Sequence, residues 1–175
     1  MTTTPRLPAS LAHPAATTET EATEAELDRM LQLALQSNAR VVRIGHGRSP
    51  AAASAARAFA CRWEAAGRIV LCAVTWPEEA ASWLRQATRF AAPNPDLWVM
   101  AGPAGGWAQM TRRLLWSTSW RPERTIAFAG IGTGRAIGLV GAVNLTGLTG
   151  ATNDGGTWAV RDGQLEIAAQ STEAR

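Results

Sequence analysis

The chain of 175 residues contains no lysine, so all 17 of its basic residues are arginine. A Walker A loop requires a lysine, and Schiff-base or pyridoxal-phosphate chemistry requires an amine, so these functions are excluded. Tyrosine is also absent, and the two histidines, His13 and His46, are too few for a histidine-rich metal centre. Catalysis would have to use carboxylates, arginines, hydroxyls, one imidazole or backbone dipoles. We therefore expect neither a bound metal nor a cofactor.

Cysteines and long hydrophobic runs are scarce as well. Cys61 and Cys72 form no disulfide framework and lack the spacing of metal ligands, and Cys72 lies in an apolar run, where we interpret it as a small buried side chain. No apolar run approaches the roughly 18 residues that a membrane span needs. The first 14 residues contain no continuous apolar region of the kind that marks a secretory signal. These absences predict a cytoplasmic protein that does not bind a membrane.

Charge is distributed unevenly along the chain. The first 28 residues hold five of the 14 acids and one arginine, so the rest carries 16 arginines against nine acids, a formal excess of seven positive charges. Such an excess suits a small anionic ligand, for example a sugar phosphate. The arginines are scattered and no nucleic-acid-binding motif is present, so a solvated surface is preferred to a nucleic-acid site.

Capping signals and hydrophobic periodicity define the expected elements. Residues 1–22 are rich in Thr, Ala and Pro and are predicted to be a disordered tail, followed by one domain over 23–175. Thr23 and Glu26 form a capping box before an amphipathic helix. Strands and helices then alternate, with strands at 41–44, 68–74, 96–101 and 125–129 and helices at 50–66, 77–90 and 107–116.

This alternation predicts a three-layer α/β fold, with a mainly parallel five-stranded sheet and helices on both faces. The fifth strand is expected at 137–143, and a C-terminal hairpin at 158–167 turns at Asp162-Gly163. In the strand order 2-1-3-4, the loops that begin at Gly45 and Gly102 face each other across the carboxyl ends of the strands. A ligand is expected in that crevice.

The segment VVRIGHGRSP at 41–50 predicts a strand, a tight turn and the start of a helix, with Ser49 at the N-cap and Pro50 at the first helical position. Such a junction directs amide groups and the positive end of a helix at an anion, although any strand–turn–helix connection uses the same residues. His46 is a candidate for proton transfer near neutral pH. Glu78 and Glu79, in the first turn of the third helix, are candidates for a general base or ordinary partners of the helix dipole.

Several short segments follow one another in a recognisable order. They are GHGRS at 45–49, ARAFA at 56–60, an aliphatic strand at 69–74, TWP at 75–77, and DLWVMA at 96–101 before the loop 102–106. In this order they resemble the SIS (sugar isomerase) domain, particularly its small hexuloisomerase-like members, over residues 26–130. The second loop, AGPAGG, lacks the serines and glutamate of the family pattern S-G-S-G-E-[TS].

The resemblance implies a SIS/flavodoxin-like fold that assembles as a homo-oligomer and binds a carbohydrate derivative, a phosphorylated sugar or a similar anion. The implied activity is aldose–ketose isomerisation through an enediol, with Glu78, Glu79 and His46 as catalytic candidates, and a silent binder is the alternative. The candidate ligand-binding residues are Gly45, His46, Gly47, Arg48, Ser49, Thr75, Gly102 and Gly105.

Two further hypotheses remain open. Seven of the eight tryptophans fall between Trp63 and Trp120, and an exposed cluster of Trp107, Trp116 and Trp120 would favour a scaffold or regulatory subunit that docks a partner protein. Packing of these rings in the core is an equally good interpretation. The third hypothesis is one lobe of a type I periplasmic-binding-like fold, which has the same β–α alternation. The lack of an export signal and of a second lobe disfavours it.

Overall fold

Two capping signals begin the helices on either side of the first strand. In this computed structural model, which describes residues 20–169, Thr23 is the N-cap of α1 (Glu24–Gln36) and accepts a hydrogen bond from the amide of Glu26 at 3.1 Å. Ser49 caps α2 (Pro50–Ala65) in the same way, with Pro50 in its first turn. Both predicted helices are confirmed. Most of the predicted tail lies outside the described residues, and the division into a tail and one domain stays a prediction.

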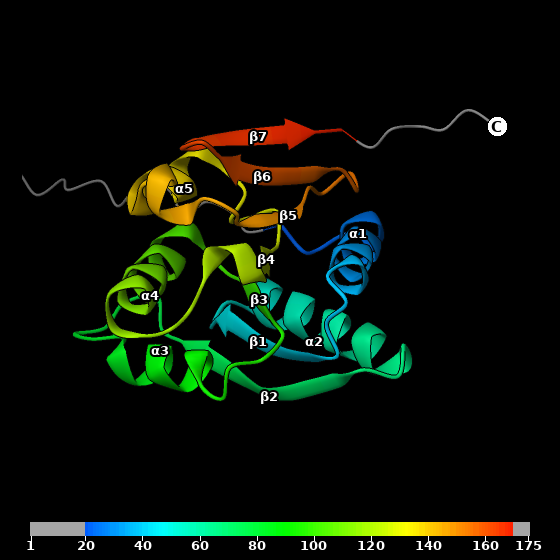
Figure 1. The fold of residues 1–175 in the computed structure, drawn as a ribbon, viewed down its shortest axis with the longest axis horizontal. Coiled ribbons are helices and arrows are strands. Elements are labelled where there is room, and N and C mark those ends of the chain that lie inside the picture. Colours follow the sequence, from blue (N-terminus) through cyan, green and yellow to red (C-terminus); the bar gives the residue numbers. More distant parts are fainter. Residues whose placement is uncertain (1–19, 170–175) are drawn as a thin grey trace, which may run out of the picture.

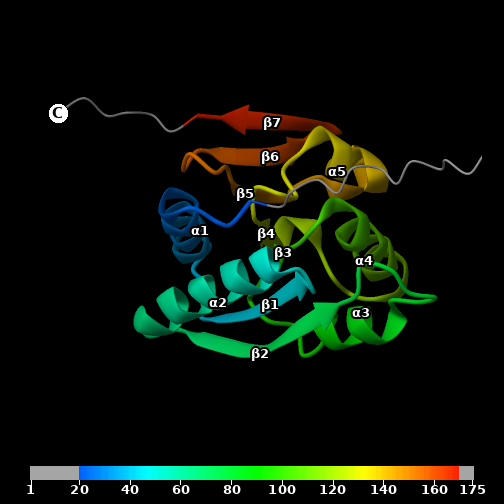
Figure 2. The same cartoon turned by 180° about the vertical axis from the view of Figure 1, so that it is seen from behind.

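A seven-stranded mixed sheet forms the centre of the fold (Figures 1 and 2), in the order β2-β1-β3-β4-β5-β6-β7. Its first five strands are parallel, and the last two form an antiparallel hairpin. The α/β class, the order 2-1-3-4 and the C-terminal hairpin are confirmed, whereas the predicted five-stranded sheet is wrong. The strands are β1 (Val41–Gly47), β2 (Ile69–Trp76), β3 (Leu97–Ala101), β4 (Thr125–Ala127), β5 (Thr149–Ala151), β6 (Thr157–Arg161) and β7 (Gln164–Ala168).

The segment predicted as the fifth strand is helical instead. Thr133 caps α5 (Gly134–Val140) by accepting a hydrogen bond from the amide of Ala136, and a short 3₁₀ turn, η2 (Ala142–Leu145), follows. Ile137 and Val140, three residues apart, are both buried, which is the spacing of a helix face rather than of a strand. The true fifth strand comes later, at β5.

The third helix, α3 (Leu84–Ala91), begins at Leu84 and not at Pro77, so it is shorter than predicted. The indole N–H of Trp83 donates to the carbonyl oxygen of Pro77 at 3.0 Å and holds the intervening chain as a loop. Glu78 and Glu79 therefore lie in that loop and not in the first turn of a helix, so their interpretation as partners of the helix dipole is wrong.

Helices cover both faces of the sheet. α1 and α2 lie on one face, whereas α3, α4 (Ala104–Ser117) and α5 lie on the other, stacked along the left of Figure 1. A 3₁₀ turn, η1 (Pro122–Arg124), precedes β4. Among residues 20–169, no helix is both long and apolar enough to cross a membrane.

Two expectations about single side chains are corrected here. Trp107 and Trp120 are buried in the core, and only Trp116 of the expected cluster is exposed, at 86%. Of the three rings, only Trp116 is therefore available for docking a partner protein, and that docking stays a prediction. Assembly as a homo-oligomer also stays a prediction. Cys72, which was expected to be buried, is exposed on β2, the edge strand of the sheet, and it belongs to neither of the hydrophobic cores on the two faces.

Candidate functional site

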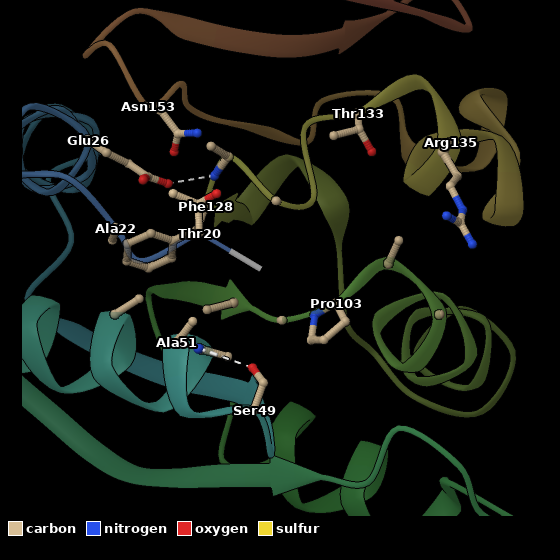
Figure 3. A pocket seen from close by; sticks show the side chains of 18 residues that line it. Thr20, Ala22, Glu26, Ser49, Ala51, Pro103, Phe128, Thr133, Arg135 and Asn153 are labelled. Carbon is tan, nitrogen blue, oxygen red and sulfur yellow. Dashed lines mark hydrogen bonds between the residues drawn. The ribbon is translucent and has the colours of Figure 1, made fainter. Parts of the chain in front are cut away.

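A cavity of about 610 Å³ opens at the carboxyl ends of β1, β3 and β4 (Figure 3). The chain runs from β1 outward to β2 and then returns to β3 on the other side of β1, so the cavity lies where the crossover direction reverses. Its walls come from the start of α2, the loop 102–105, the loop between β4 and α5, and the N-terminal end of α1. The starts of two helices therefore contribute as well as two loops, whereas the sequence analysis concentrated on the loops that begin at Gly45 and Gly102.

Small apolar side chains form much of the cavity surface. Ala51, Ala52 and Ala55 come from the first two turns of α2, Ala101 from the end of β3, and Phe128 from the residue after β4. Because alanine fills little volume beyond its Cβ, this run of small residues leaves space at the end of the sheet. The cavity can therefore accept an apolar group of a ligand.

Two helix N-termini end at this cavity. Ser49 Oγ accepts a hydrogen bond from the amide of Ala52 at 3.2 Å, which leaves its hydroxyl hydrogen available for another acceptor. The N-cap of α4 is Pro103, which has no polar side-chain atom to satisfy the first amides of that helix. Unsatisfied amides and the positive ends of helix dipoles favour a negatively charged group nearby.

Glu26 brings a carboxylate from α1 to the cavity wall, although the residue is only 2% exposed. Its Oε1 accepts a hydrogen bond from the amide of Ala129 at 2.7 Å, marked in Figure 3. Burial raises the pKa of Glu26 above its ordinary value, and the hydrogen bonds from the amides of Ala129 and Thr23 oppose that rise. The sequence analysis assigned Glu26 only to the capping box and did not predict that its carboxyl group also lines the cavity.

The wall opposite Glu26 carries Thr133, at the end of the loop after β4, and Arg135, in the first turn of α5 (Figure 3). Arg135 is exposed, so its guanidinium is free to approach a ligand from solvent. The sequence analysis missed both residues because it assigned the following segment to a strand. A Thr-Gly-Arg sequence, with threonine as an N-cap, is the signal that would have placed a helix start there.

The structure separates the residues predicted to bind or to act. Ser49, Gly102 and Gly105 line the cavity, whereas the other candidates do not: Gly45, His46, Gly47, Arg48, Thr75, Glu78 and Glu79. His46 lies within β1 beside Thr75 of β2, and its Nδ1 lies 2.6 Å from the carbonyl oxygen of Gly47. Arg48, Thr75 and Glu79 are exposed outside the cavity lining. The predicted catalytic and ligand-binding residues are thus only partly brought together.

Packing accounts for the glycines of the first loop. A Cβ on Gly45 would lie 2.6 Å from ring atoms of both Phe90 and Trp76. A Cβ on Gly47 or Gly106 would overlap the carboxylate of Glu78, which lies against both residues. Gly45 leaves room for rings from β2 and α3, and Glu78 lies between the end of β1 at Gly47 and the first turn of α4 at Gly106.

The sequence matches no protein-family model, and no curated protein matches it. Solved structures do match. A substrate-binding periplasmic protein from Ralstonia solanacearum is 12% identical, with a TM-score of 0.62 over 74% of this chain and 36% of its own. A branched-chain amino acid ABC transporter periplasmic ligand-binding protein from Burkholderia xenovorans LB400 is 14% identical, with a TM-score of 0.58 over 73% of this chain and 34% of its own.

A third match is a solute-binding protein of an ABC transporter from Rhodopseudomonas palustris HaA2, in complex with p-hydroxybenzoic acid. It is 16% identical, with a TM-score of 0.55 over 72% of this chain and 34% of its own. The chain thus spans about a third of the length of these neighbours, and the likeness shows a periplasmic-binding-protein-like fold.

This likeness corrects three expectations. The resemblance to the SIS domain is wrong, because the structural neighbours are ligand-binding proteins of ABC transporters. Isomerase activity and sugar-phosphate binding lose their basis with it, since the motifs around Gly45 and Thr75 also suit this other β–α alternation. The cytoplasmic assignment is wrong by the same comparison, because these neighbours are periplasmic proteins. The hypothesis that the sequence analysis disfavoured, a periplasmic-binding-like lobe, has the matching fold.

Proposed function

We propose that this chain is a ligand-binding domain that holds a small organic carboxylate in the cavity at the ends of β1, β3 and β4. The observation that carries this proposal is the cavity itself. It combines an apolar surface from α2 and Phe128 with two helix N-termini, the hydroxyl of Ser49 and the guanidinium of Arg135. Apolar surface with a few convergent polar groups is the usual composition of a small-molecule site.

The structural neighbours support the assignment of this chain as a binder of small ligands. One of them is a branched-chain amino acid transporter protein and another holds p-hydroxybenzoic acid, so carboxylates suit this fold. The periplasm is the compartment that their names suggest for this chain. Binding of a ligand without chemical change is the activity that we assign, because Glu78, Glu79 and His46 lie outside the cavity lining.

A cavity-filling variant tests the proposal. Ala55 lines the cavity and is 6% exposed, so Ala55→Leu places a larger side chain in the space that the ligand needs. Leucine, valine, p-hydroxybenzoate and inorganic phosphate are titrated against thermal unfolding and by calorimetry. A carboxylate at 100 times its dissociation constant stabilises the fold by about 2.7 kcal/mol, and Ala55→Leu should abolish this gain.

Ala65→Leu is the matched control, because Ala65 is exposed at the far end of the same helix. This variant should bind as the parent does. The proposal is wrong if no carboxylate raises the melting temperature, or if Ala55→Leu binds as tightly as Ala65→Leu.

A further inference from the structure

The polar groups of the cavity are divided between two walls. Figure 3 shows Glu26 and Asn153 on one side, and Arg135 and Thr133 on the other. Ser49 lies at the start of α2, and the remaining surface is formed largely by Phe128 and alanine side chains. A ligand in this cavity therefore meets a negative group and a positive group at different ends, with apolar surface between them.

The two ends select different chemical groups. A carboxylate is favoured beside Arg135 and the helix N-termini, and beside Glu26 it would meet a second carboxyl group, which repels it when that group is ionised. The carboxylate of Glu26 accepts hydrogen bonds from the backbone amides of Ala129 and Thr23. A carboxylate has about four lone-pair positions, so a further donor can be accommodated. An apolar group placed there would instead deprive a buried acceptor of water.

Resting on the proposed function, we infer that the preferred ligand carries its carboxylate at one end and a hydroxyl or amino donor at the other, joined by a flat or extended apolar spacer. Glu26 accepts the hydrogen bond of that donor and so determines specificity. An α-amino acid fits this arrangement poorly, because its ammonium and carboxylate groups are on adjacent carbons and cannot reach opposite walls.

A matched pair of probes isolates the donor. Benzoate and 4-hydroxybenzoate differ only in the hydroxyl opposite the carboxylate, and calorimetry on the full chain compares them with leucine. We expect 4-hydroxybenzoate to bind at least about tenfold more tightly than benzoate, as for a hydrogen bond to a charged acceptor, and more tightly than leucine. Glu26→Leu should reduce the ratio between the two benzoates to about twofold or less, without weakening benzoate.

Further variants separate specificity from folding. Glu26→Gln keeps the shape and one acceptor oxygen, so it should retain a reduced preference if Glu26→Leu proves unstable. Glu64→Gln, on an exposed position of α2, should leave both affinities unchanged. Equal binding of the two benzoates, or leucine as the tightest ligand, overturns this inference and leaves the proposed function intact. If no carboxylate binds, the proposed function itself fails.

Discussion

The two faces of the sheet are packed by different kinds of side chain. On the α3–α5 face, five tryptophans are buried together, whereas on the α1–α2 face the core consists largely of alanines and aliphatic residues with Trp63 as its one buried indole among the described residues. Strand β3 shows the division directly: Trp98 and Met100 belong to the first core, and Leu97, Val99 and Ala101 to the second. The buried tryptophans of the first face are Trp76, Trp98, Trp107, Trp120 and Trp158.

This difference determines where the cavity can form. The indoles are large enough that neighbouring backbone positions must be glycine: a Cβ on Gly45 or Gly150 would lie 2.6 Å from a tryptophan ring. The alanine face has small side chains at the same end of the sheet, and the 610 Å³ cavity lies there. Gly45 and Gly150 therefore lie where rings are packed, whereas Ala51, Ala52 and Ala55 lie where space is left for a ligand.

The largest expected effect comes from removing a ring on the tryptophan face. Trp98 is fully buried, and its indole N–H donates to the carbonyl oxygen of Phe90 at 3.0 Å. Trp98→Ala should lower the free energy of unfolding by about 3–5 kcal/mol, measured by urea denaturation. Trp116→Ala is the matched control and should change stability by less than about 0.5 kcal/mol, because Trp116 is 86% exposed. Similar losses in both variants would contradict the packing described here.

A smaller loss of stability is expected when a methyl group is added to Gly45, against the rings of Trp76 and Phe90. Gly45→Ala places a Cβ against Trp76 and Phe90 and should cost about 1–3 kcal/mol in urea denaturation. Combined with Phe90→Leu, which makes room, the loss should be less than the sum of the two single losses. Gly138→Ala, on an exposed position of α5 with open space around it, should instead stabilise by up to about 1 kcal/mol. A neutral Gly45→Ala would contradict the close packing of Trp76 and Phe90 against this glycine.

Local signals predicted much of the fold up to β4. Caps at Thr23 and Ser49 and the alternation of apolar runs are properties of neighbouring residues, so the first two helices and the places of the first four strands along the chain could be predicted from the sequence. The spatial order 2-1-3-4 was assumed for the sheet, and the structure has it. The prediction for residues 130–150 was wrong because two of the glycines there, Gly132 and Gly150, are packed against a ring that is distant in sequence. A Cβ on Gly132 or Gly150 would overlap Trp158, which follows them in the chain but packs beside them in space.

The site was harder to predict than the fold. Topology indicated the end of the sheet at which the cavity lies, and Ser49 and Gly102 line that cavity. Glu26 reaches the same cavity from a helix that precedes the first strand, through a hydrogen bond to Ala129, 103 residues away in sequence. No spacing rule connects residues so far apart. Arg135 was missed because its helix was assigned to a strand.

The smallest expected effect tests the buried carboxylate of the alanine face. Because the folded-state pKa of Glu26 is raised above the unfolded value of about 4.3, its neutral form is favoured by folding. The stabilisation is complete below that value and is lost as the pH rises through the folded pKa. Glu26→Gln stays neutral, and its side-chain oxygen can still accept the amide of Ala129. Its melting temperature relative to the parent should therefore increase between pH 4 and pH 7.

Asp96 provides the control of opposite sign. Hydrogen bonds at 2.9 Å from the amides of Arg40 and Val41 to its Oδ2 lower its pKa, so its stabilisation is present above the unfolded value of about 3.9 and is lost as the pH falls through the folded pKa. Asp96→Asn should consequently be less stable than the parent at pH 7 and approach it in acid. The relative melting temperatures of the two variants could instead change in the same direction with pH. Burial would then not dominate the pKa of Glu26, and this carboxyl group would be a solvated capping residue.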